Sequence, residues 1–211
     1  MIRTISLAMF AVAVMSPVAA SAQGMTPKPV VRLMTQAPGT PGNMGLLAVL
    51  MAEVHNVERH VRFAASRTGN LDWTKGQAMH VLHAISPEKV ADGRGLGYGL
   101  RKAIAAVGIE TGKAAGEKNA ADAVKLHATH VAASLSNSMS RAESLAELAE
   151  KVIAAPDPVV AAPLVRQMQD LTRALISGVD ADGNGTVSWE AGEGGIEQVE
   201  RHLELMAAAA G

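Results

Sequence analysis

Oxygen-bearing side chains alternate along one short segment near the C-terminal end of the chain. Residues 180–193 read DADGNGTVSWEAGE and place Asp180, Asp182 and Asn184 at positions one, three and five, with Gly185 at six. A hard cation such as Ca²⁺ takes about six to eight oxygen ligands, and alternate side chains of a tight turn point inward together. Glycine permits the sharp bend that larger residues resist. The spacing therefore predicts a calcium-binding loop.

Two further residues fit the same interpretation. Thr186 at position seven offers a backbone carbonyl, and Ser188 at nine offers a hydroxyl that can hold a bridging water. The segment resembles the EF-hand calcium loop, and the apolar residues on either side extend the resemblance over about residues 168–206. The resemblance implies a helix–loop–helix unit, which we place at about 164–206.

The chain departs from the EF-hand pattern at one position. The resemblance implies a bidentate glutamate at position twelve, where this chain has Ala191. Glu190 at eleven and Glu193 at fourteen are the two candidates to replace it, because the glycines around Glu193 let the chain leave a regular helix. We expect weak affinity, with a Kd of about 10⁻⁴ to 10⁻³ M. The alternative is a turn without metal, since Asp, Asn and Gly favour turns by themselves.

Four of the seven histidines form pairs spaced by three residues. The pairs are His80/His83 and His127/His130. Residues at this spacing share a helix face, and imidazoles bind Zn²⁺, Cu²⁺ or haem iron. The alternative function is therefore a helical bundle that binds a transition metal or haem through these histidines. We favour hydrogen-bonded or surface histidines over such a site.

Composition excludes several other classes. The chain has no cysteine, which excludes thiolate zinc sites, iron–sulfur clusters and covalent c-type haem. Its formal charge of −1 gives no support to nucleic-acid binding. The glycine-rich stretch 93–102 could cradle an anion at a helix start, but it lacks P-loop spacing and a preceding strand. We predict that the protein is not an enzyme.

The N-terminal segment has the pattern of an export signal. Residues 1–22 combine Arg3, a short apolar run and a final Ala-Ser-Ala, which predicts a cleaved signal peptide and a soluble periplasmic or secreted protein. Residues 23–43 contain Pro27, Pro29, Pro38 and Pro41 without apolar periodicity, and we expect a flexible tether there. No later segment is apolar and long enough to span a membrane.

The remaining chain, 44–211, predicts an all-α domain. Hydrophobic residues make up 48% of the sequence and aromatic residues only 2%, so Ala, Val, Leu, Ile and Met must form the core. The apolar spacing predicts an antiparallel helical bundle that ends in the EF-hand-like unit. We expect a first helix capped by Asn43, followed by helices over about 72–85, 100–115 and 120–154. Pro156 and Pro158 separate the last of these from a fifth helix that runs to Ser177, and a sixth covers about 192–206.

Overall fold

The computed structural model describes residues 26–211, and this part of the chain is all-α. It contains seven α-helices, a short 3₁₀ helix and no strand, which confirms the predicted fold class for these residues. The elements are α1 (Lys28–Met34), η1 (Pro41–Asn43), α2 (Leu46–Ser66), α3 (Leu71–Ile85), α4 (Leu100–Ala115), α5 (Asp122–Ala154), α6 (Pro158–Ser177) and α7 (Ile196–Ala210). The predicted signal peptide, 1–22, lies outside the described residues.

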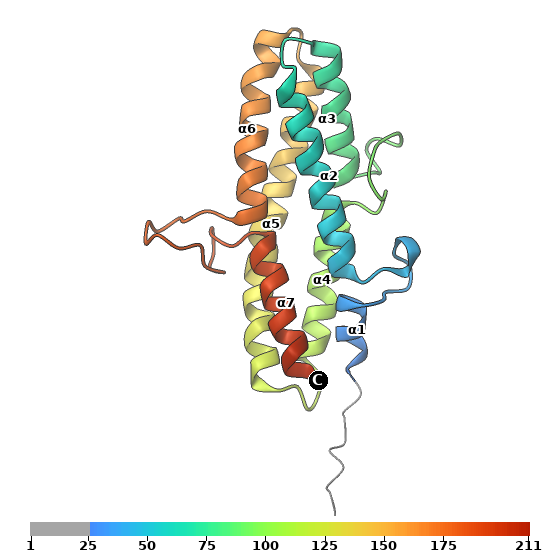
Figure 1. The fold of residues 1–211 in the computed structure, drawn as a ribbon, viewed down its shortest axis with the longest axis vertical. Coiled ribbons are helices and arrows are strands. Elements are labelled where there is room, and N and C mark those ends of the chain that lie inside the picture. Colours follow the sequence, from blue (N-terminus) through green and yellow to red (C-terminus); the bar gives the residue numbers. More distant parts are fainter. Residues whose placement is uncertain (1–25) are drawn as a thin grey trace, which may run out of the picture.

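The long helix α5 organises the molecule. It runs along the long axis of the bundle, and α6 and α7 follow one another along it (Figure 1). Its buried positions are aliphatic or small, such as Val131, Leu145 and Ala149, so neighbouring helices can approach closely. The two ends of α6 follow from local chemistry, because the Asp157 side chain caps the Val160 amide and Gly178 ends the helix at a φ of 85°.

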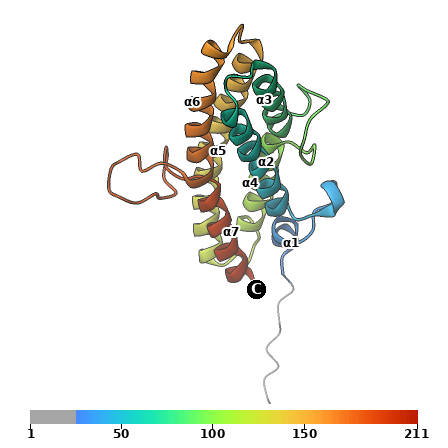
Figure 2. The same ribbon diagram turned by 45° about the horizontal axis from the view of Figure 1, so that its top comes forward.

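Two segments leave the bundle on opposite sides. One joins α3 to α4 and the other joins α6 to α7, and both project from the helices in two views (Figures 1 and 2). They correspond to the glycine-rich stretch and to the predicted calcium loop. In the described part of the chain, no helix has the length and apolar character needed to cross a membrane.

The structure corrects the expectation of a flexible tether over 23–43 for the residues of that range that it describes, 26–43. Residues Lys28–Met34 form α1, whose Val30 and Leu33 are buried in the core. Proline is tolerated in the first helical turn, where its missing N–H has no helical partner to lose, so Pro29 is compatible with this helix. The helix is too short for apolar periodicity to reveal it, and its burial depends on tertiary contacts.

Two predicted helix starts also differ from the structure. Asn43 does not cap the first long helix, since it lies in η1 at a φ of 54° and α2 begins at Leu46. The last helix begins at Ile196 rather than at residue 192. Residues 191–193 instead form a turn, and Gly194 and Gly195 are buried, with Gly195 in an extended conformation just before α7.

Candidate metal centres

The segment between α6 and α7 is a closed loop whose two ends touch. The Val179 amide donates to the Glu193 carbonyl at 3.0 Å. A Cβ atom on Gly195 would lie 2.5 Å from the Ile176 carbonyl oxygen and 2.6 Å from the Gly178 amide nitrogen, so only glycine fits there. We call these contacts the neck of the loop. Because the neck closes, α7 can continue along α5 where α6 stops.

Helix α5 holds the returning part of the loop. The Arg141 guanidinium donates to the carbonyls of Ala174 and Gly194, both at 2.8 Å, and to the Glu193 carbonyl at 3.0 Å. Asn137, one turn earlier, donates to the Glu190 carbonyl at 2.8 Å and accepts from the Gly192 amide at 2.9 Å. These two side chains fix the backbone around Glu193. No local pattern identifies them, because they lie 51 to 55 residues before the loop positions that they bind.

Three carboxylates meet in this loop. Asp180, Asp182 and Glu193 each offer an oxygen that lies within 4.8 Å of the other two. Asp180 and Asp182 are exposed, whereas Glu193 is only 3% exposed. Among residues 26–211, no salt bridge reaches any of the three. Their negative charges are therefore not balanced by a side chain.

Backbone amides shape the loop around Asp180. Its two carboxylate oxygens accept from the amides of Gly183 at 2.9 Å, Asn184 at 3.1 Å and Gly185 at 2.9 Å. Asp182 accepts from the Asn184 amide at 3.0 Å. A carboxylate offers about four acceptor positions, so these bonds leave lone pairs available. The alternating residues thus fold into the tight turn that their spacing predicts.

Glu193 is held in its charged form. Hydrogen bonds from the Ser188 hydroxyl and the Ser188 amide lower the pKa of Glu193, and the Asp182 backbone adds to this effect. Burial and the negative charge of Asp180 act in the opposite direction and are outweighed. The bond from the Ser188 amide to the Glu193 carboxylate is 2.8 Å long.

The side chains of Asn184 and Ser188, which are also predicted ligands, accept hydrogen bonds within the loop. Asn184 Oδ1 accepts from the Thr186 amide at 2.9 Å and from its hydroxyl at 2.6 Å. Ser188 Oγ accepts from the Glu190 amide at 3.0 Å. The structure brings Glu193 to the two aspartates and leaves Glu190 exposed outside the group.

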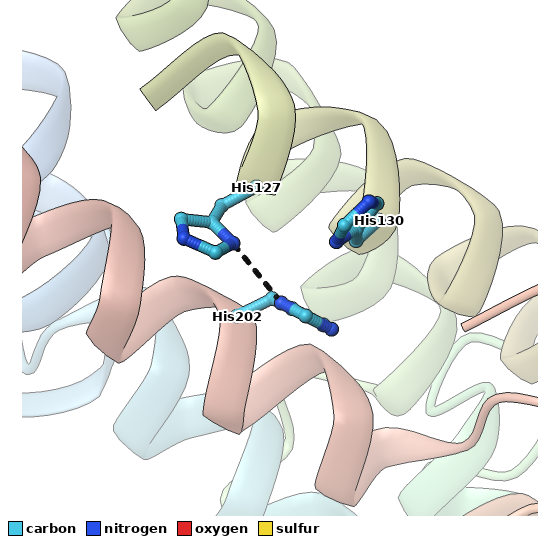
Figure 3. A group of neighbouring side chains, drawn as sticks. All are labelled: His127, His130 and His202. Atoms are coloured by element: carbon cyan, nitrogen blue, oxygen red, sulfur yellow. Dashed lines mark hydrogen bonds between the residues drawn. The ribbon is translucent and has the colours of Figure 1, made fainter. Parts of the chain in front are cut away.

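A second cluster joins three histidines between α5 and α7. His127 and His130 come from α5 and His202 from α7, and each offers a ring nitrogen within 4.8 Å of the other two (Figure 3). The Nδ1 atoms of His127 and His202 are 3.2 Å apart. His130 Nδ1 is buried without a hydrogen-bond partner, and its ring stacks on Trp189 with centroids 4.0 Å apart. We call these residues the histidine triad.

The surroundings keep His202 neutral. Burial is the largest cause that lowers the pKa of His202 to about 4, and the neighbouring His130, His127 and Arg201 contribute to the same shift. The pKa of His130 is also lowered, again mainly by burial. Neutral imidazole is the form that binds a metal.

The predicted pair His80/His83 does not belong to a group of three ligands within residues 26–211. His83 Nδ1 lies 2.6 Å from the Val90 carbonyl oxygen, so that nitrogen is already paired. The His80 ring packs 4.8 Å from the His60 ring. Sequence spacing placed two members of the triad on one helix face, but it could not find His202, whose approach depends on how α7 packs.

The glycine-rich stretch does surround a carboxyl group with backbone amides, but that group belongs to the protein itself. The Glu53 carboxylate is fully buried on α2 and accepts from the amides of Tyr98 and Gly99, both at 3.0 Å. A third amide, from Leu96, lies 3.4 Å away. Glu53 thereby fixes the segment that joins α3 to α4.

Comparison with known protein families, with curated proteins and with solved structures gives no match to this chain. The chemistry of the two clusters is therefore the basis for any functional conclusion.

Proposed function

We propose that the protein is an exported calcium-binding protein with a single EF-hand-like loop, in which the ion has a structural role. The observation that carries the proposal is the position of Glu193, whose carboxylate lies with those of Asp180 and Asp182. The missing glutamate of position twelve is thus replaced by one at position fourteen.

The loop offers a sufficient set of oxygens. The direct ligands are side-chain oxygens of Asp180, Asp182, Asn184 and Glu193 and the backbone carbonyl of Thr186. Ser188 contributes through a bridging water. With Glu193 bidentate, this set reaches the six to eight oxygens, roughly, that calcium takes. Three carboxylates without a balancing side chain favour a divalent cation over a plain turn.

The proposed site differs from an EF-hand in how its last ligand is held. In an EF-hand the closing glutamate belongs to the exit helix, whereas here α7 starts three residues after Glu193. Arg141 and the neck position Glu193 instead. A calcium ion would join the exposed Asp180 and Asp182 to the buried Glu193, whose backbone is held by Arg141 of α5.

A weak site suits an exported protein. Calcium sites of extracellular modules have Kd values of roughly 10⁻⁴ to 10⁻³ M. The signal-peptide pattern of residues 1–22 supports export to the periplasm or beyond.

Thermal unfolding with and without calcium tests the proposal. Calcium at about 10 mM is roughly 10 to 100 times the expected Kd, so it should raise the Tm of the wild-type protein by about 3–10 °C. The Asp180→Ala variant should stay helical and lose this shift. Equal shifts in both proteins would show that the loop is a turn without a specific metal site.

A further inference from the structure

We propose that His127, His130 and His202 form a binding site for a transition-metal ion, Zn²⁺ or Cu²⁺, between α5 and α7. The site has donors distinct from those of the calcium loop, and its zinc binding can be tested in the absence of calcium. It replaces the predicted use of His80 and His83, and it adds a ligand from the last helix.

The spacing of two ring nitrogens fits two ligands of one ion. Zinc–nitrogen bonds of about 2.0–2.1 Å at a tetrahedral angle place two ligand nitrogens about 3.3 Å apart. The Nδ1 atoms of His127 and His202 are separated by 3.2 Å. His130 lies one turn from His127 on the same helix, and its ligand nitrogen is within 4.8 Å of the others. The three rings lie together between α5 and α7 (Figure 3).

One buried atom of the triad lacks a partner. His130 Nδ1 is inaccessible to solvent and forms no hydrogen bond within the described residues. A buried polar atom left unpaired costs about 1–3 kcal/mol. Coordination through this nitrogen would remove that cost, whereas a purely structural cluster leaves it in place.

The donor set determines the class of ion. The triad contains imidazoles and no carboxylate. Imidazole suits Zn²⁺, Cu²⁺ and Ni²⁺, while Ca²⁺ and Mg²⁺ prefer oxygen ligands. His202 is buried, and the Trp189 ring covers one face of His130. Three protein ligands leave a fourth coordination position for water or another donor.

Zinc titration of the full chain against a chromophoric chelator tests the site. The wild-type protein should bind one Zn²⁺, and His202→Gln should weaken binding at least about 10- to 100-fold, the range found even for loss of an outer partner. The matched control is His55→Gln, which removes an exposed histidine of α2 outside the triad. That variant should bind zinc like the wild type.

A second variant, His127→Gln, separates loss of a metal ligand from a folding defect in His202→Gln. His127 is only partly buried, so its replacement should disturb the core less. Circular dichroism should show wild-type helicity in this variant, with the same loss of zinc affinity. Asp180→Ala should retain zinc binding. Equal zinc affinity in the wild type and both triad variants would overturn the proposal, and so would loss of zinc binding in Asp180→Ala alone.

Tryptophan fluorescence gives an independent measure of where the metal ion binds. Trp73→Phe leaves Trp189, stacked on His130, as the sole tryptophan. One equivalent of Cu²⁺ should quench its emission, and the added substitution His202→Gln should remove this quenching. Quenching that persists unchanged in the double variant would place the copper elsewhere.

Discussion

At the residue scale, Glu193 has two properties that rarely occur together. It is a buried carboxylate, and it faces two other carboxylates. Hydrogen bonds from Ser188 keep its pKa low, so repulsion from Asp180 is not relieved by protonation. A divalent cation is the simplest partner for such a group.

Substitution of Glu193 should therefore remove calcium binding. Glu193→Gln keeps the shape of the side chain but removes one charge, and we expect the calcium affinity measured by calorimetry to fall at least about 10-fold. Glu190→Gln is the matched control, since Glu190 is exposed and outside the group. Weaker binding in the Glu190 variant than in the Glu193 variant would reverse the assignment of the closing ligand.

Local spacing in the sequence predicts some of the site residues and not others. The oxygens at 180, 182 and 184 were predictable because their spacing is local, and the tight turn that they form is present. The choice between Glu190 and Glu193 could not be predicted from the sequence, because it depends on contacts with Arg141 and Asn137 of α5. His202 was missed for the same reason, since its neighbours lie on another helix.

At the element scale, the main feature is that α6 and α7 continue along the same helix, α5, with a closed loop between them (Figure 1). Gly178 and Gly195 make this possible, because their backbones touch at the neck. Helices α2 to α7 were predictable from apolar spacing and from proline and glycine boundaries, whereas α1 was not. The neck was not predictable, since the contact joins residues from both ends of the loop.

A side chain at the neck should loosen both the loop and the start of α7. Gly195→Ala places a Cβ 2.5 Å from the Ile176 carbonyl oxygen, and we expect a loss of about 1–3 kcal/mol in the free energy of unfolding. Urea unfolding monitored by circular dichroism measures this loss in the free energy of unfolding.

Gly112→Ala in α4 is the control for that substitution, because a Cβ there meets nothing within 4 Å. Alanine at a helical glycine should be neutral or stabilising by up to about 1 kcal/mol. A Gly195 variant as stable as the Gly112 variant would contradict the close contact at the neck.

At the scale of the whole molecule, the proposed calcium loop and the histidine triad are neighbours. Ser188 donates to the Glu193 carboxylate, and the next residue, Trp189, stacks on His130. Calcium bound by Glu193 would thus fix the segment that covers the triad. The two proposed ions should favour each other's binding, because coupling between sites is reciprocal.

Zinc affinity should accordingly increase in the presence of calcium. We expect a change of roughly 5-fold or more, the lower end of typical coupling, in chelator competition with and without millimolar calcium. Trp189→Leu should retain both sites and lose the coupling. The same zinc affinity with and without calcium in the wild type would show that the sites are independent.

Buried histidines should make the metal-free protein sensitive to acid. Burial lowers the pKa values of His60, His80, His130 and His202 below the ordinary 6.5. The unfolded chain then takes up protons at a higher pH than the folded one. Stability is fully present above about pH 6.5 and falls as the pH drops, for His202 down to its folded pKa of about 4.

Urea unfolding between pH 7 and 4 measures this loss. Each such histidine contributes a slope of up to about 1.4 kcal/mol per pH unit. His202→Gln should reduce the slope. An identical slope in the wild type and the His202 variant would contradict a neutral, buried His202.

The most direct test of calcium binding is a count of the ion. The purified protein and its Asp180→Ala variant are dialysed to equilibrium against about 1 mM calcium, within the range of weak extracellular sites, and bound calcium is measured by elemental analysis. We predict about 0.5 to 0.9 calcium ions per wild-type chain, the occupancy that a Kd of about 10⁻³ to 10⁻⁴ M gives, and none above background for the variant. No bound calcium in the wild type, or equal amounts in both proteins, would contradict a calcium site at 180–193.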